Sequence, residues 1–324
     1  MRRASITLLL LLTLTTAVFG QAASDKPEER KVSSNPDEAR IVTSDIDLFW
    51  KAYDRARPEN NLIVFRDEYL RVGSYGLKQF TRLRIGNSCN LVDQIEKRPR
   101  YYASIRQSTL KIDSMKEAIR VNLRRLKELY PEAVFPDIYF LIGRMNSGGT
   151  LTANALLIGS EMYARTATTP TEEMNDWERQ VIKGVEGVPH IVAHELIHYQ
   201  QKYAASATLL ARSMNEGAAD YIAELVSGGN INDHLHRYGN ERERELWEEF
   251  KKEMDANDVS RWLYQGDQSK DRPADLGYYM GYKIAEAYYK RAADKKQAVK
   301  DILQIKDFHQ FLAASGYAEK FKTK

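Results

Sequence analysis

The segment from His190 to Gln201, HIVAHELIHYQQ, places two histidines, His194 and His198, four residues apart. It contains no helix breaker after Pro189, which suits the first turn of a helix, so it predicts an α-helix. Residues four apart in a helix lie one turn apart on the same face, so both imidazoles can bind one metal ion. Glu195 lies about 100° further round, where its carboxylate can reach a metal-bound water. The alternative is a helix that carries histidines by chance.

A third metal ligand is expected from the next predicted helix, which begins near Ser213 and reads SMNEGAADYIAE. Glu216 falls in its first turn and can face the histidine helix, as a site with three protein ligands requires. Asp220, one turn further, can accept the outer N–H of a ligating imidazole. Two alternatives stay open: Glu216 as a carboxylate favoured by the helix dipole, and Asp220 as a surface charge. His190 is either a residue that lines the cleft or supports a ligand, or an ordinary hydrogen-bonded histidine.

The N-terminus predicts export. Residues 1–20 start with Arg2 and Arg3 and continue as an apolar run that ends in small residues, which is typical of a secretory signal peptide. The run is short for a membrane span, which leaves an uncleaved anchor as the alternative, and the one cysteine, Cys89, lies far from the cleavage point. We therefore expect a periplasmic or secreted protein with no stable membrane anchor. Residues 21–40 are polar and predict a flexible tether.

The charge of the chain argues against nucleic acid as a partner. The full chain has a formal net charge of +3, and loss of the two leader arginines lowers it to +1. A chain so close to neutral lacks the basic surface that nucleic acid requires. Because one cysteine cannot form an internal disulfide, the exported protein must be stabilised by its core, and by a metal if one binds.

The first half of the remaining chain has a helical pattern. In residues 41–135, apolar residues recur at intervals of three and four, which predicts helices over 46–56, 65–85 and 115–130. Prolines at 131 and 136 then end the helical run. We expect this N-terminal helical region to pack on the rest of the chain.

Short apolar, β-prone stretches follow at 137–143 and 154–160, and the polar segment 146–150 between them predicts a turn. The two stretches are expected to form a hairpin or two neighbouring strands. These stretches belong to the second predicted region, 136–324, and the rest of that region is again helical. The whole is therefore predicted to be one compact α+β unit.

The motifs HELIH and NEGAAD resemble those of the gluzincin metallopeptidases. A closer likeness is to a family of zinc-dependent proteases in exported bacterial proteins that is labelled as a domain of unknown function, DUF2268. The stretches that carry the likeness are PDIYFLIGR, NSGGT, LLIGSEM, PHIVAHELIHYQQ, EGAADYIAEL and GYYMGYKIAEAYY. The resemblance implies a mostly helical zincin-like fold with a small sheet or hairpin next to the HExxH helix.

The resemblance also implies roles for single residues. It implies that Zn²⁺ is the cofactor, bound by His194, His198 and Glu216, with Asp220 supporting an imidazole. Glu195 is then the catalytic carboxylate, which takes a proton from a zinc-bound water as the water attacks a peptide bond. The expected substrate is a peptide or protein.

Two features of the predicted peptidase are less specific. An oxyanion donor is expected in GYYMGY, where Tyr278 and Tyr282 share a helical face, with core packing as the alternative for both. The strand from Ala153 to Ile158 is the candidate edge for an extended substrate, or an ordinary hairpin strand. Two other functions stay open: a non-catalytic, zinc-stabilised binding protein, and a zinc hydrolase of a non-peptide bond. The intact Glu195 favours the peptidase.

Overall fold

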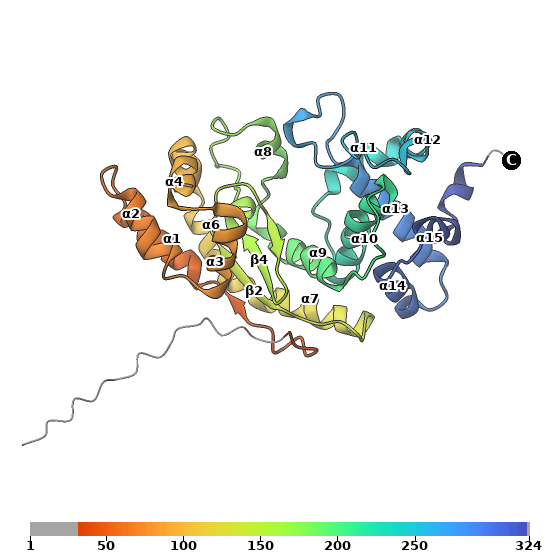
Figure 1. Cartoon of the computed structure of the whole chain (residues 1–324), viewed down its shortest axis with the longest axis horizontal. Coiled ribbons are helices and arrows are strands. Elements are labelled where there is room, and N and C mark those ends of the chain that lie inside the picture. Colours follow the sequence, from red (N-terminus) through yellow and green to blue (C-terminus); the bar gives the residue numbers. More distant parts are fainter. Residues whose placement is uncertain (1–31, 323–324) are drawn as a thin grey trace, which may run out of the picture.

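A small four-stranded sheet lies between two groups of helices (Figure 1). The computed structural model describes residues 32–322, so the predicted signal peptide and most of the predicted tether lie outside the described residues. The strands are β1 (Ile41–Val42), β2 (Asp137–Leu141), β3 (Gly149–Leu151) and β4 (Ala155–Gly159), in the order β1-β2-β4-β3. β2 runs parallel to β1 and to β4, and β3 runs antiparallel to β4.

The two central strands are buried on both faces. β2 reads DIYFL and β4 reads ALLIG, and every residue of both is buried. Strands without polar alternation are typical of a parallel pair covered on both sides, and Ile138 lies beside Leu156 in the register. The predicted neighbouring strands are therefore present, as a parallel pair.

The third strand was not predicted. The segment 146–150 was expected to be a turn. Its last two residues, Gly149 and Thr150, instead form β3 together with Leu151, and β3 makes the hairpin with β4. Gly148 and Gly149 read as turn residues in sequence, but here Gly148 makes room for the Tyr163 side chain and Gly149 for Glu195 of the neighbouring helix. β4 is paired on both sides, so the edges of the sheet are β1 and β3, and the predicted edge at Ala153–Ile158 is wrong.

Of the N-terminal helices, α1 and α3 pack against β2, whereas α7 packs against α9 (Val188–Gln200) and α10 (Leu209–Ser227). The predicted helix over 65–85 is divided, because the chain turns at Gly73 and Ser74 caps a new helix by accepting a hydrogen bond from Leu77 N. This group contains α1 (Ser44–Arg55), α2 (Asn61–Phe65), α3 (Tyr75–Phe80), α4 (Ser88–Lys97), α5 (Pro99–Ser104), α6 (Arg106–Lys111) and α7 (Lys116–Leu129), with π-helical turns at Arg66–Leu70 and Thr81–Ile85 and a 3-10 turn at Ile112–Met115.

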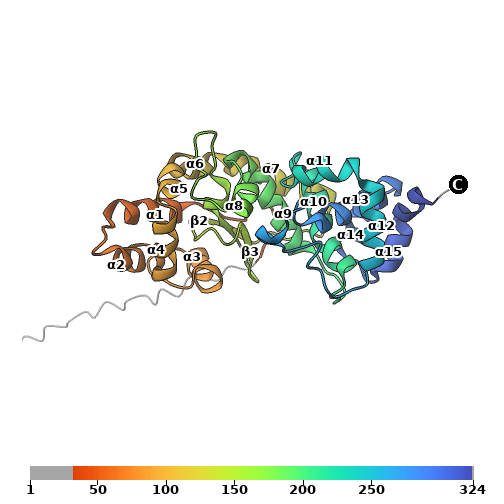
Figure 2. The same ribbon diagram turned by 90° about the horizontal axis from the view of Figure 1, so that it is seen from above.

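The other face of the sheet is covered by α9, which contacts β3 and β4 and leads into the C-terminal helices (Figure 2). This group contains α8 (Asp176–Val181), α9 (Val188–Gln200), α10 (Leu209–Ser227), α11 (Asp233–Glu241), α12 (Glu243–Glu253), α13 (Leu276–Arg291), α14 (Lys295–Leu303) and α15 (Phe308–Ser315), with 3-10 turns at Ser160–Tyr163, Val185–Gly187, Gly266–Gln268 and Tyr317–Phe321.

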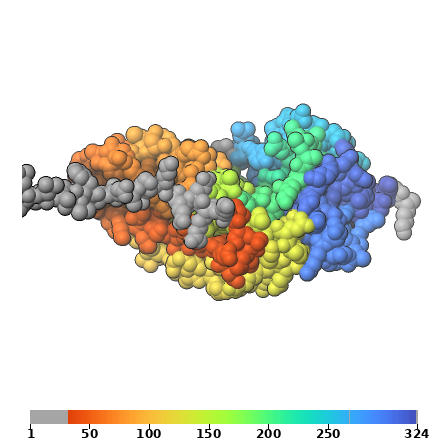
Figure 3. Space-filling model, turned by 60° about the horizontal axis from the view of Figure 1, so that its bottom comes forward, coloured from red at the N-terminus to blue at the C-terminus, as the bar shows by residue number. Residues whose placement is uncertain are grey.

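The end of the predicted tether lies against the body. Ser33 pairs with Phe135, Ala39 is buried, and Arg120 of α7 donates to the Ala39 carbonyl. Figure 3 shows this segment in red beside α7 in yellow, which adjoins the C-terminal helices in blue. A single hydrophobic core runs through both helical groups. Within residues 32–322, no helix is both long and apolar enough to cross a membrane. The predicted α+β class, mostly helical with a small sheet beside the histidine helix, is confirmed.

Candidate metal centre

Helix α9 carries the histidine motif through the middle of the molecule. Pro189 stands in its first turn, and its apolar residues face in all directions, against β3, β4, α7 and α10. A helix that is apolar all round belongs in a core, and His194 is only 4% exposed. Buried imidazoles need partners within the protein, so the neighbouring helices decide what these histidines do.

Helix α10 supplies the carboxylates. It begins at Leu209, where Thr208 caps it by accepting from Ala211 N, and it ends at Gly228 in the left-handed conformation. The predicted start at Ser213 was therefore late, and Glu216 lies in the second turn. The helix dipole acts within the first turn, so it does not account for the position of Glu216.

The side chains of His194, His198 and Glu216 converge. Nε2 of His198 lies 3.0 Å from Nε2 of His194 and 3.2 Å from Oε2 of Glu216, and Nε2 of His194 lies 3.8 Å from that oxygen. These three residues form a group that could hold a metal ion, with all ligand atoms within 4.8 Å of one another.

The outer nitrogens of both imidazoles are already engaged. Nδ1 of His194 lies 2.7 Å from Oδ1 of Asp220. Nδ1 of His198 lies 2.8 Å from Oε1 of Gln201, whose amide nitrogen donates to the Asn215 carbonyl. Both outer nitrogens therefore carry the proton in the neutral imidazoles. The two Nε2 atoms then present lone pairs to each other and to a carboxylate, and either a metal ion or a proton between them would relieve this arrangement.

The pKa values point the same way. Burial opposes charge on His194, but Asp220 and Glu216 outweigh it and raise the pKa of His194 to about 10. Burial also lowers the pKa of His198, but the nearby Glu216 outweighs this effect, so the pKa of His198 is raised. The pKa of Glu216 lies well below its usual range, because the two histidines outweigh its burial. The group as a whole attracts positive charge.

Three residues near this group were missed in the sequence. Gln201 accepts from His198, and Asn232 donates from Nδ2 to Oδ2 of Asp220 over 2.8 Å. Tyr264 donates its hydroxyl to Oε1 of Glu216 over 3.2 Å from a backbone with φ of 60°. Gln201 could have been found from its place three residues after His198. Asn232 and Tyr264 lie in loops with no motif of their own.

The two predicted oxyanion donors are separated. The ring of Tyr278 lies nearly parallel to that of His194, with centroids 6.2 Å apart. Burial, reinforced by the carboxylate of Glu216, raises the pKa of Tyr278 well above its usual range. Tyr282 instead donates to Oε2 of Glu224 at 3.0 Å and takes no part in the histidine group.

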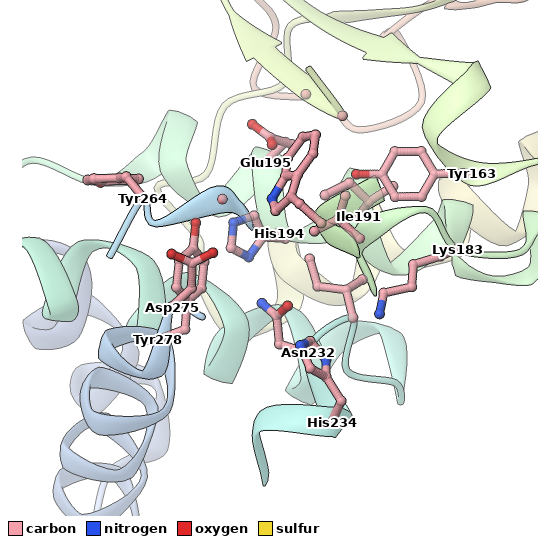
Figure 4. A pocket seen from close by; sticks show the side chains of 16 residues that line it. Tyr163, Lys183, Ile191, His194, Glu195, Asn232, His234, Tyr264, Asp275 and Tyr278 are labelled. Atoms are coloured by element: carbon pink, nitrogen blue, oxygen red, sulfur yellow. The ribbon is translucent and has the colours of Figure 1, made fainter. Parts of the chain in front are cut away.

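A cavity of about 410 Å³ opens beside His194 (Figure 4). The side chain of Glu195 lines it and lies against β3, so closely that a β-carbon on Gly149 would be 2.1 Å from Oε1 of Glu195. His190 lies away from the lining residues and pairs through Nδ1 with the hydroxyl of Ser227 at 2.9 Å. The carboxylate of the HELIH motif, Glu195, therefore faces the cavity.

The loop that leads into β3 is held by a buried carboxylate. Glu161 accepts from Gly143 N at 2.8 Å and from Met145 N at 3.1 Å. Met145 has a φ of 57°, which a side chain rarely adopts. Burial raises the pKa of Glu161 to about 7, although these backbone hydrogen bonds lower it. This loop positions Gly148 and Gly149 at the cavity.

Comparison with known proteins corrects the predicted family and activity. The sequence model of a family described as gliding motility protein GldB matches residues 25–319. This match overturns the likeness to gluzincins and to DUF2268, so the predictions of a zinc peptidase and of a hydrolase are wrong. The roles of single site residues, the metal and the partners stay predictions.

The family model carries a lipoprotein label, which agrees with the predicted export of the chain. No curated protein and no solved structure matches the chain, so the zincin-like detail of the fold stays a prediction. Because the family match spans nearly the whole sequence, this chain belongs to the family of the gliding motility protein GldB.

Proposed function

We propose that this protein is an exported component of the gliding machinery that binds one Zn²⁺ ion through His194, His198 and Glu216. Its membership in the family of the gliding motility protein GldB supports the role in gliding. The observation that carries the metal proposal is the convergence of two imidazole Nε2 atoms and one carboxylate oxygen, with both Nδ1 atoms already hydrogen-bonded.

The donor set fits zinc. Two imidazole nitrogens and one carboxylate oxygen are ligands that zinc accepts, and tetrahedral bonds of about 2.1 Å keep such donors roughly 3.4 Å apart. The separations of 3.0, 3.2 and 3.8 Å bracket that value. Hydrogen bonds from Nδ1 to Asp220 and Gln201 are the support that ligating histidines normally have. A bound ion would neutralise Glu216 and link α9 to α10.

We further propose that the binding partner is a peptide or protein. The predicted zincin-like fold, with a metal-binding helix beside an edge strand, supports this proposal. In the β3–β4 hairpin, Gly159 N donates to Gly148 O, so Gly149 and Leu151 direct their N–H and C=O groups away from β4. The Gly149 carbonyl already accepts from the hydroxyls of Ser147 and Thr150, which leaves Gly149 N–H and the Leu151 groups for pairing. An extended chain can pair with such an edge through its backbone.

The place of action in this proposal is the periplasm or the medium. The single cysteine, Cys89, lies in α4 of the folded body, so this sequence has no cysteine near the leader that could carry a lipid. The proposal therefore departs from the lipoprotein label of the family on this point.

The metal proposal is tested by elemental analysis of the purified mature chain after incubation with zinc and gel filtration. We expect one zinc per chain, and less than a tenth of that in His198→Ala and Glu216→Gln. His309→Ala is the matched control, because His309 lies on the surface beside Asp255. A wild-type chain without zinc, or a His198→Ala chain with full zinc, would overturn the proposal.

The role in gliding is tested in a gliding host. Deletion of the gene should stop spreading of cells on agar, and the wild-type gene should restore it. If the His198→Ala gene restores gliding at the same protein level as wild type, gliding does not require the bound metal.

A further inference from the structure

The end of the cavity away from Glu195 and Asp275 is basic. Lys183 and His234 line it, and the ammonium of Lys183 points toward the side that carries His234 and Asn232 (Figure 4). None of these residues belongs to the histidine group, and the family description does not account for them. The inference drawn from them rests on the proposed peptide or protein partner and does not depend on the metal.

The charge of Lys183 is not neutralised. Its Nζ donates to the Gln180 carbonyl at 2.8 Å, and no carboxylate oxygen of the described side chains lies within 4.0 Å of it. Asp233 acts on Lys183 from further away, but it is already paired with Arg237. A partly buried ammonium without a carboxylate is costly, so this position favours an anion from outside the chain.

His234 lacks a partner as well. Its Nδ1 is buried and has no hydrogen bond with any described residue. Burial and the positive charge of Lys183 lower the pKa of His234 to about 4, so the ring is neutral at ordinary pH. A neutral imidazole retains one N–H donor, and because Nδ1 is closed off, it is Nε2–H that can donate to an anion beside Lys183.

The opposite end and the walls have different chemistry. Glu195 and Asp275 make that end acidic, and Tyr163, Trp177 and Tyr278 contribute aromatic walls. Gly148 and Gly149, at the start of β3, line the same cavity. The volume of about 410 Å³ is within the range of small-ligand sites. The cavity thus suits an elongated ligand with a negative group at one end.

We propose that this cavity binds a peptide segment through a carboxylate, which Lys183 and His234 hold. The carboxylate comes either from the end of the peptide chain or from an acidic side chain. The aromatic walls contact its apolar part, and the β3 edge pairs with its backbone. Lys183 is the residue that selects for the negative group.

Calorimetric titration of the full mature chain tests the proposal. The probes are acetyl-Ala-Phe-Ala-Ala as the free acid, the same peptide as the amide, and acetyl-Ala-Phe-Asp-Ala as the amide. We expect at least one carboxylate peptide to bind at least about tenfold more tightly than the uncharged amide, and the better of the two identifies the source of the carboxylate. Equal binding of all three peptides would overturn the proposal.

Two variants separate the anchor from the rest of the protein. Lys183→Met should weaken the carboxylate peptides by at least about tenfold, as expected for a lost charge-assisted hydrogen bond, and leave the uncharged amide unchanged. Lys252→Met, at an exposed lysine of α12, is the matched control and should bind as wild type. Wild-type affinity in Lys183→Met, or full displacement of the peptide by equimolar phosphate, would overturn the proposal.

Each titration is run on zinc-treated and on chelator-treated protein, with the zinc content measured. If the zinc-treated chain contains no zinc and still binds the peptides through Lys183, this inference stands and the metal proposal is rejected. If the chain binds one zinc ion but none of the three peptides, the metal proposal stands and this inference is rejected. Circular dichroism of Lys183→Met excludes loss of folding as the cause of weaker binding.

Discussion

The close crossing of α10 and α13 makes Gly217→Ala a sharp perturbation. A β-carbon at Gly217 would lie 2.1 Å from Tyr282 N and 2.4 Å from the Tyr278 carbonyl oxygen. These are backbone atoms of a packed helix, and ordinary contact begins near 3.4 Å. No rotamer change can relieve the overlap, so the two helices must separate by roughly 1 Å.

The magnitude follows from the kind of contact. Overpacking a core costs about 1–3 kcal/mol, and an overlap with backbone belongs at the upper end. A loss of about 3 kcal/mol should lower the melting temperature by roughly 5 °C in a chain of this size. Glu216 adjoins Gly217, so we also expect zinc affinity to fall at least about tenfold.

The assay is thermal unfolding followed by circular dichroism, with zinc affinity measured by chelator competition. Gly187→Ala is the matched control, because a β-carbon there would meet only Cβ of Lys183, at 3.8 Å; it should melt as wild type. Gly281→Ala, which would place Cβ 1.8 Å from the Ser213 carbonyl oxygen, should cost about as much as Gly217→Ala. The double variant should cost less than the sum, since one separation relieves both overlaps. A Gly217→Ala chain with wild-type melting and zinc affinity would refute this account of the crossing.

Three further predictions concern the support of the metal ligands, the cavity loop and the leader. Asp220→Asn should lower zinc affinity by about 10–100-fold in chelator competition, and an unchanged affinity would show that its hydrogen bond to His194 does not matter. The pKa of Glu161 is raised from 4.5 to about 7, so its protonation stabilises the fold fully below about pH 4.5 and this contribution is lost as the pH rises through about 7. Relative to Glu161→Gln, wild type should lose on the order of 3 kcal/mol across that interval in urea unfolding; parallel pH profiles would contradict this. Cells fed labelled palmitate should leave this protein unlabelled, and a labelled chain would reverse the proposed absence of a lipid anchor.

The likeness of the motifs was a poor guide to family and activity. HELIH and NEGAAD describe how a few side chains are spaced on two helices, and this spacing can bring ligands together in proteins of different function. The family match extends over residues 25–319, which include the N-terminal helices that the motifs ignore. Whole-chain similarity therefore decided the family where local spacing could not.

The histidine helix, its ligand face and the carboxylate helix were readable from the sequence, because residues one turn apart must share a face whatever surrounds them. The parallel pairing of β2 with β4 and the presence of β3 were not readable, since strand partners are chosen by packing across the whole domain. Asn232, Tyr264, Lys183 and His234 likewise meet at the cavity only through the crossing of distant loops and helices. Local geometry thus determined which residues can bind a metal, and tertiary packing alone decided what lies beside them.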